Sequence, residues 1–202
     1  MLFNALYNSN MKAKLISGLL CAIIFTFALG LSAEPRISVR TNYYNLYSTT
    51  ASGLRAEMNR KGIRWTDGKT YDAFASWYVS WRYEYYTNSG RCVLEYIDVS
   101  VEIEYTLPKW VTQFMGGKET RIKWLKYIDA LKKHERGHGN IGISAASDIE
   151  KALLRLGSNP SCRALGEEAN AIGYRILDNY GKREVEYDRS TGHGRTQGAV
   201  FP

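Results

Sequence analysis

The stretch KETRIKWLKYIDALKKHERGHGNIGISAASDIEKALLRL, residues 118–156, contains no proline and repeats its apolar residues at helical spacing. Two sets carry this period: Ile122, Leu125, Ile128, Ala130 and Leu131, and then Ile141, Ala145, Ile149 and Leu153. The stretch therefore predicts one long helix, or two helices in near-continuity. Residues 157–160 include a glycine and a proline, so we expect them to stop the helix. Residues 161–181 then predict a second helix that runs back along the first.

The long predicted helix carries HERGH, residues 134–138, which has the spacing His-Glu-x-x-His. Residues four apart lie on one face of a helix, so His134 and His138 can reach the same zinc ion. Glu135 can then reach a water molecule on the metal and act as general base. The only other histidine of the chain is His193, between two glycines in TGHG at 191–194. We therefore predict one Zn²⁺ bound by His134, His138 and His193, with Glu135 as the catalytic residue.

The dimensions of a helical hairpin narrow the choice of third ligand. Carboxylates farther along the first helix lie about 15 Å or more from His138, too far to share a metal. A hairpin centred near Asn159 instead places residue 181 level with residue 137, and the segment after 181 lies beside the metal. We expect residues 182–202 to form a glycine-rich loop or tail. His193 is the preferred ligand in this segment because zinc favours imidazole, and Asp188 is the next candidate, as ligand or as partner to an imidazole.

Two features near the motif have both a functional and a structural interpretation. Gly137, Gly139 and Gly142 weaken a helix interior, which indicates either the close approach of another segment or a kink without a role. Tyr187 either donates a hydrogen bond to the developing oxyanion or is a packing residue.

The region before residue 118 is rich in β-strand patterns. Residues 36–48 alternate apolar and polar side chains, and residues 50–62 have helical periodicity. Residues 73–87 and 91–107 predict a hairpin through the turn at 88–90, and Pro108 is expected to end its second strand. The prediction is an α+β fold, a single zincin-like domain over residues 34–202 in which an antiparallel sheet packs on the two helices.

The first 33 residues have the features of a secretory signal peptide. Lys12 and Lys14 precede an apolar run from Leu15 to Leu31, and small residues follow up to Ala33. We predict cleavage after Ala33 and a periplasmic or secreted protein with no membrane span in its mature form. A retained N-terminal anchor is the alternative, although the apolar run is near the lower length limit for a span.

The cysteines of the exported chain predict a disulfide, and its net charge limits the kinds of partner to expect. Cys92 and Cys162 are the two cysteines left after cleavage, and in an oxidising compartment they most simply form a disulfide. The net charge of +7 falls to +5 on loss of Lys12 and Lys14, and this basic balance favours anionic surfaces such as lipid headgroups or envelope polymers, or is solvated surface. The basic residues are scattered without a run, so the sequence does not predict nucleic-acid binding.

Four segments together resemble a known bacterial family. They are Trp77-Tyr78-Val79-Ser80-Trp81, Leu107-Pro108, HERGH and the terminal YDRSTGHGRTQGAVFP at 187–202. The family is the one catalogued as domain of unknown function nine-two-two, whose members are usually labelled secreted zinc-dependent proteases. The resemblance implies a zincin-like exported hydrolase. Because the protease label itself rests largely on the His-Glu-x-x-His motif, the resemblance adds more about fold and compartment than about substrate.

The expected function is that of an exported zinc metallopeptidase acting on a peptide or cell-envelope substrate. Two alternatives stay open. The first is a non-enzymatic envelope protein with a structural zinc site, which a closed set of four ligands would support. The second is a hydrolase of another amide, such as a peptidoglycan cross-link, because an exported basic protein suits an anionic cell-wall polymer.

Overall fold

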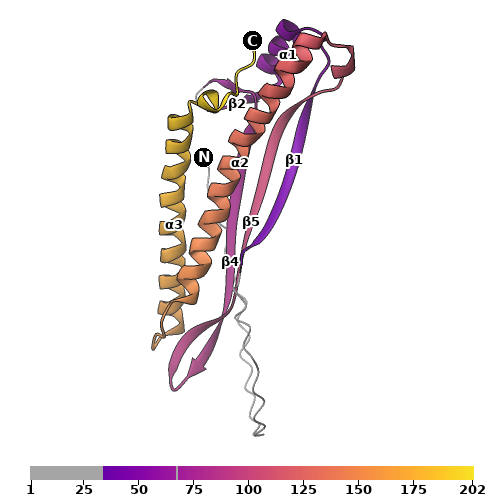
Figure 1. Cartoon of the computed structure of the whole chain (residues 1–202). Coiled ribbons are helices and arrows are strands. Elements are labelled where there is room, and N and C mark those ends of the chain that lie inside the picture. Colours follow the sequence, from indigo (N-terminus) through magenta and orange to yellow (C-terminus); the bar gives the residue numbers. More distant parts are fainter. Residues whose placement is uncertain (1–33, 67) are drawn as a thin grey trace.

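Two long helices packed on a three-stranded sheet form the body of the molecule (Figure 1). The computed structural model describes residues 34–202 except residue 67, so the predicted signal peptide lies outside the described residues. In chain order the elements are β1 (Arg36–Leu46), α1 (Ala51–Lys61), β2 (Ile63–Arg64), β3 (Thr70–Tyr71), β4 (Phe74–Asn88), β5 (Arg91–Trp110), the 3₁₀ turn η1 (Gln113–Met115), α2 (Lys118–Leu154), α3 (Cys162–Thr191) and the 3₁₀ turn η2 (Arg195–Gln197). The α+β prediction is confirmed.

The sheet has the strand order β1-β5-β4 and is mixed rather than wholly antiparallel. The predicted β4–β5 hairpin is present, and Ser89 and Gly90 turn the chain with positive φ angles of 51° and 74°. However, β1 pairs with β5 in parallel, which corrects the antiparallel prediction. Strand β5 also continues through Pro108, which pairs with Tyr44 of β1. Strand β4 starts at Phe74, which pairs with Thr106, so beyond Thr106 β5 has only β1 as a neighbour in the sheet. A proline is tolerated at such a position.

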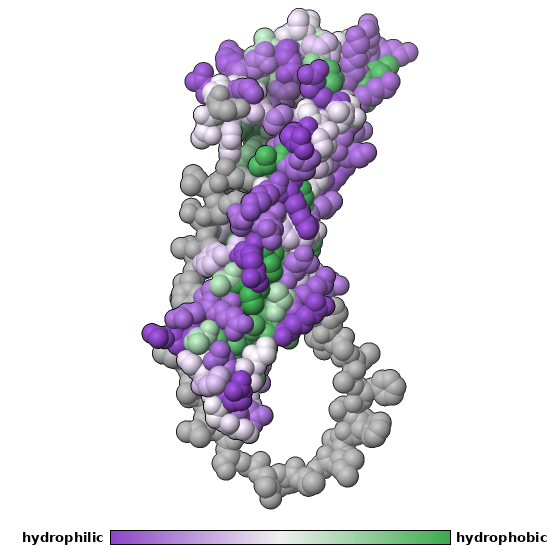
Figure 2. Space-filling model, turned by 90° about the vertical axis from the view of Figure 1, so that its left-hand side faces the viewer, coloured by the Kyte–Doolittle hydropathy of each residue, from purple (hydrophilic) through white to green (hydrophobic). Residues whose placement is uncertain are grey.

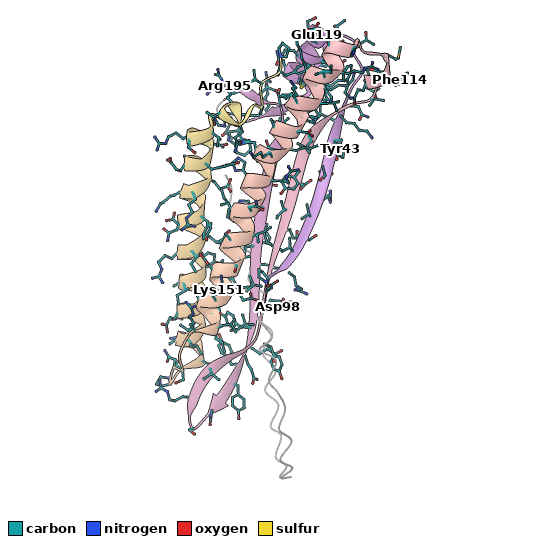
Figure 3. All side chains as sticks on the ribbon, viewed as in Figure 1. Tyr43, Asp98, Phe114, Glu119, Lys151 and Arg195 are labelled. Atoms are coloured by element: carbon teal, nitrogen blue, oxygen red, sulfur yellow. A yellow bond between two sulfur atoms is a disulfide. The ribbon has the colours of Figure 1, made fainter. Side chains whose placement is uncertain are left out.

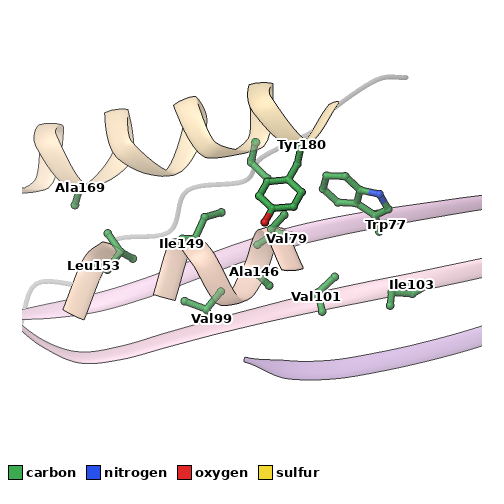
Figure 4. Close-up of a cluster of buried hydrophobic side chains, with 12 residues drawn as sticks. Trp77, Val79, Val99, Val101, Ile103, Ala146, Ile149, Leu153, Ala169 and Tyr180 are labelled. Atoms are coloured by element: carbon green, nitrogen blue, oxygen red, sulfur yellow. The ribbon is translucent and has the colours of Figure 1, made fainter. Parts of the chain in front are cut away.

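Helix α2 is one continuous helix that covers one face of β4 and β5, and α3 packs beside it. Alternate residues of the strands point inward, since successive side chains of a strand face opposite sides. Val99, Val101 and Ile103 of β5 meet Ala146 and Ile149 of α2 in one buried cluster (Figure 4). A second cluster surrounds Trp124, Tyr127 and Leu131 at the other end of α2 and includes the buried ring of Phe201 near the C-terminus. Figure 2 views the molecule from the side on which α3 lies, and the surface seen there is mostly hydrophilic.

Helix α3 runs ten residues beyond its predicted end, to Thr191, and this corrects the expectation of a loop after residue 181. Gly181 is accommodated inside the helix, and no further glycine or proline follows until Gly192. Gly192 then ends the helix in a left-handed conformation with φ 56°, and the His193 N–H donates to Asp188 O at 3.0 Å. The extension places Glu184 and Asp188, four residues apart, on one face of a rigid helix.

The disulfide between Cys92 and Cys162 is present, as predicted. It joins the tip of the β4–β5 hairpin to the first residue of α3, where Cys92 and Asn159 also exchange two backbone hydrogen bonds. Among residues 34–202, position 67 aside, no helix is both long and apolar enough to cross a membrane. A disulfide is typical of proteins that fold in an oxidising compartment outside the cytoplasm.

The glycines of α2 are positions of close approach, as one of the two interpretations predicted. A Cβ at Gly142 would lie 2.5 Å from Cγ of Trp77, whose ring belongs to the main core. We therefore expect Gly142→Ala to lower the free energy of unfolding by about 1–3 kcal/mol through overpacking, despite the gain in helix propensity. Chemical denaturation of Gly157→Ala is the control, because a Cβ at Gly157 meets nothing within 4 Å. Equal stabilities of the two variants would contradict the prediction.

Candidate metal site

Helices α2 and α3 bring two imidazoles and a carboxylate to one point. The Nε2 atoms of His134 and His138 lie 3.3 Å apart, and Asp188 Oδ1 lies 3.2 Å and 3.0 Å from them. The potential ligand atoms of the three residues all lie within 4.8 Å of one another, so the group could hold one metal ion. The sequence prediction of a shared face for the two histidines is confirmed in its geometry. The antiparallel course of α3 supplies the third group.

The opposite nitrogens of both imidazoles are held by hydrogen bonds that orient the rings. His138 Nδ1 lies 2.5 Å from Glu184 Oε2, and the other oxygen of this carboxylate accepts a hydrogen bond from Trp77 Nε1 at 2.8 Å. His134 Nδ1 lies 3.0 Å from Gln197 Oε1, on the turn η2. When both imidazoles are neutral and both Nδ1 atoms donate, the Nε2 lone pairs face the common point, as metal binding requires. Such carboxylate and amide partners are the usual support of metal-binding histidines.

Tyr187 packs its ring against the imidazoles of both His134 and His138. Its ring stacks on that of His134 at 5.1 Å between centroids, and its hydroxyl donates to the His134 carbonyl at 3.2 Å. The same hydroxyl accepts a hydrogen bond from Gln197 Nε2 at 3.0 Å. It fits against Gly137, where a Cβ would lie 2.0 Å from the hydroxyl oxygen. Tyr187 therefore packs against the site and orients its residues, and donation to an oxyanion stays a prediction.

Charges around the site favour a positive charge at the meeting point of the three groups. Burial lowers the pKa of the His138 imidazole, but the hydrogen bonds that it donates to Asp188 and Glu184 outweigh this effect and raise its pKa to about 10. Burial raises the pKa of Asp188, yet the two histidines bring it well below its ordinary value. The carboxylates thus stabilise a cation here, whether it is a proton or a metal ion. The donor set fits zinc, which binds imidazole nitrogen and carboxylate oxygen.

Glu135 lies beside the three groups, and its side chain is buried. Burial raises the pKa of its carboxyl group to about 7, although the two histidines act in the opposite direction. Glu135 also lines a pocket of about 370 Å³ that adjoins the three groups. Apolar and aromatic side chains form much of the wall, including Trp65, Tyr71, Phe74, Leu131 and Val185. An ion pair between Arg55 and Asp72, with Nη1 and Oδ1 2.8 Å apart, forms another part of it.

His193 lies at the edge of this group. Its Nδ1 atom is 3.4 Å from Asp188 Oδ1, its side chain is about half exposed (51%), and its ring lies 5.2 Å from that of Tyr71. The three residues whose ligand atoms meet include Asp188 and leave out His193. The assignment of His193 as a zinc ligand stays a prediction. The glycines beside it act as expected in one respect, because Gly194, with φ 82°, lies against His134, where a Cβ would be 3.0 Å from Cγ.

The site predicted from the sequence does not include Gln197, which orients His134, or Glu184, which orients His138. It also leaves out Trp77, which holds the carboxylate of Glu184. A signal for Glu184 does exist, because Glu184 and Asp188 repeat the four-residue spacing of His134 and His138. Gln197 and Trp77 lie in segments that carry the family resemblance, but their roles depend on contacts between distant segments, which the sequence alone does not give.

The protein is therefore an α+β domain that carries a His-Glu-x-x-His helix and a candidate His/His/Asp metal site. Residues 41–194 match the family described as bacterial protein of unknown function (DUF922), and the chain belongs to this family. The match includes His134, Glu135, His138, Glu184, Asp188 and His193. Neither the curated proteins nor the solved structures contain a match to the chain.

The support that Glu184 gives to His138 leads to a prediction about metal affinity. We expect Glu184→Gln to weaken zinc binding by roughly 10- to 100-fold, because the neutral amide accepts the imidazole hydrogen bond less strongly. The affinity is measured by competition with a chelator of known zinc affinity. Glu186→Gln is the matched control, since Glu186 lies on the same helix but is exposed and pairs with Arg189. Equal affinities of the two variants would refute the role of Glu184.

Proposed function

We propose that this protein is a zinc-dependent hydrolase of amide bonds, a metallopeptidase that acts outside the cytoplasm. The observation that carries the proposal is the convergence of His134, His138 and Asp188 beside the buried Glu135. A site that only needed to bind a metal would not require this fourth group at the wall of a pocket.

His134, His138 and Asp188 would hold the zinc ion, with Glu184 and Gln197 fixing the two imidazoles. Bound zinc supplies a Lewis acid that polarises a carbonyl group and lowers the pKa of water toward 7. Three protein ligands leave a coordination position open, as in catalytic rather than structural zinc sites.

Glu135 supplies the proton transfers in this proposal. Its carboxylate accepts a proton from the attacking water and then donates it to the nitrogen of the leaving amine. A general base works best when its pKa lies near the operating pH, and burial moves Glu135 in that direction. The overall reaction balances, since one water adds across the amide to give a carboxylate and a protonated amine.

The pocket beside the three groups is the proposed substrate site. Its volume of about 370 Å³ and the apolar and aromatic side chains in its wall suit a peptide side chain next to the cleaved bond. A peptide is therefore the first substrate to test. An amide of the cell wall shares the same reacting group and is distinguished by digestion of purified wall material.

One observation favours a second candidate, a non-enzymatic zinc-binding protein. His193 lies 3.4 Å from Asp188, and a small movement of its ring would add it to the other three ligands. Four protein ligands close a zinc site to substrate. In this candidate Glu135 has no role in proton transfer.

The test uses purified residues 34–202, which contain every described helix and strand. We expect one zinc ion per chain, and hydrolysis of a peptide library that stops on treatment with a chelator and returns on addition of zinc. Mass spectrometry of the products then gives the cleaved bonds. A zinc-loaded protein that hydrolyses neither peptides nor purified wall material would favour the non-enzymatic candidate. A chain that binds no zinc would overturn both.

A further inference from the structure

The chain turns from β5 into α2 at one end of the molecule, and this corner exposes large apolar side chains. We define the β5–α2 corner as residues 111–118. Phe114 is 77% exposed, Met115 is 60% exposed and Val111 is 41% exposed. Figure 3 shows Phe114 projecting from this end, away from the body of the fold. Single exposed apolar residues are ordinary, but three within five positions at a turn form a contiguous group.

Hydrogen bonds and a buried tryptophan fix the backbone of the corner in place. Trp110, directly before it, is buried against Trp124 with 5.8 Å between ring centroids, and its Nε1 donates to Ser48 O at 2.7 Å. Thr112 Oγ1 donates to Tyr47 O at 2.7 Å, and the Met115 N–H donates to Thr112 O at 2.9 Å. The exposed side chains therefore stand on a rigid turn and do not depend on a loop that could fold back to cover them.

Basic residues flank this apolar group along the chain. Lys109 precedes the corner, Lys118 ends it, and Lys123 and Lys126 follow on the first turns of α2, all exposed or half-exposed. Glu119 is the acid among them, and its carboxylate is 2.7 Å from Lys123. Ile122 and Leu125, 47% and 50% exposed, lie between these lysines along the helix. Apolar side chains at a tip with lysines around them match the headgroup and acyl layers of an anionic lipid surface.

We propose that the β5–α2 corner docks the protein on anionic lipid membranes, with Phe114 and Met115 inserted at the level of the headgroups and the lysines bound to lipid phosphates. An anionic polymer would satisfy the lysines but leave the apolar group in water, so a lipid surface fits both features. Helix α2 leads directly from the corner to the candidate metal site, and His134 lies about 24 Å along the helix axis from Lys118.

The test measures sedimentation of residues 34–202 with vesicles. Vesicles of phosphatidylglycerol and phosphatidylethanolamine are compared with vesicles of phosphatidylcholine alone. We expect binding to the anionic vesicles that weakens with added salt. The double variant Phe114→Ser/Met115→Ser should bind roughly tenfold more weakly or worse, because both inserted side chains are lost. Tyr96→Ser is the matched control and should bind like the wild type, since Tyr96 is 74% exposed but belongs to the β4–β5 hairpin.

A charge-reversal pair separates the role of the lysines. Lys118→Glu/Lys126→Glu should reduce binding to anionic vesicles by roughly tenfold or more, whereas Lys151→Glu/Arg155→Glu, at the opposite end of α2, should reduce it much less. Figure 3 shows Lys151 far from Phe114 along α2. Thermal unfolding of each variant verifies that it is folded. The proposal is overturned if the wild type binds neither kind of vesicle, or if Phe114→Ser/Met115→Ser binds as well as Tyr96→Ser.

Discussion

Replacing Glu135 by glutamine is expected to reduce amide hydrolysis by about 10²- to 10⁴-fold while zinc stays bound. Glutamine keeps the size of the buried side chain but cannot accept the proton of the attacking water. The ligand group of His134, His138 and Asp188 does not include Glu135, so the metal affinity should change little. Initial rates on the best cleaved peptide give the first quantity, and zinc content after dialysis gives the second.

The control for this variant is Glu186→Gln, which alters an exposed acid on α3 and should keep full activity. The comparison also separates the two functions considered for the site. If Glu135→Gln keeps both zinc and activity, Glu135 is not the base and the proposed chemistry fails. If it loses zinc as well as activity, Glu135 supports the metal directly and its role as a base must be tested by another route.

The parts of the fold that the sequence predicted are those encoded by local patterns. The period of apolar residues from Ile122 to Leu153 predicted the long helix, and Asn88-Ser89-Gly90 predicted the hairpin turn. The Cys92–Cys162 disulfide followed from the number of cysteines expected to remain after export. The shared face of His134 and His138 is a property of helix geometry alone, so it too needed no knowledge of the rest of the chain.

The errors lie where distant segments decide the outcome. The parallel pairing of β1 with β5 joins residues 64 positions apart. The sequences of the two strands do not indicate whether they pair in parallel or antiparallel. Pro108 is predicted to end β5 because proline cannot donate a hydrogen bond to a neighbouring strand, but β4 starts only at Phe74, opposite Thr106, so β5 pairs with β1 alone at Pro108. The end of α3 was placed at Gly181, although the helix is stabilised past that point by packing against α2.

The misplaced helix end had the largest consequence for the candidate site. A loop over residues 182–202 leaves the third ligand free to be any residue of that segment, and imidazole preference then selects His193. A helix through Thr191 instead fixes Asp188 one turn beyond Glu184 and opposite His138. Rigid placement of the carboxylate, rather than ligand preference, makes Asp188 the better candidate in the structure.

Asp188→Ala is therefore expected to lower zinc affinity by more than about 100-fold, and His193→Ala by less than about tenfold. Loss of a direct ligand should exceed the 10- to 100-fold effect typical of residues that only orient the ligands. His193 is half exposed and contacts the group only through Asp188, so its removal leaves the three ligand atoms in place. Chelator competition at fixed pH measures both affinities.

Asp178→Ala is the control for Asp188→Ala, because Asp178 is an exposed acid on α3 that pairs with Lys182. Thermal unfolding without added metal shows whether each variant keeps the fold, since Asp188 Oδ1 also lies 3.0 Å from His138 Nε2. If His193→Ala loses zinc as completely as Asp188→Ala, all four residues bind the metal. The site would then be closed, and the non-enzymatic candidate would replace the hydrolase. Retention of zinc by Asp188→Ala together with its loss in His193→Ala would instead restore the three-histidine site that the sequence predicted.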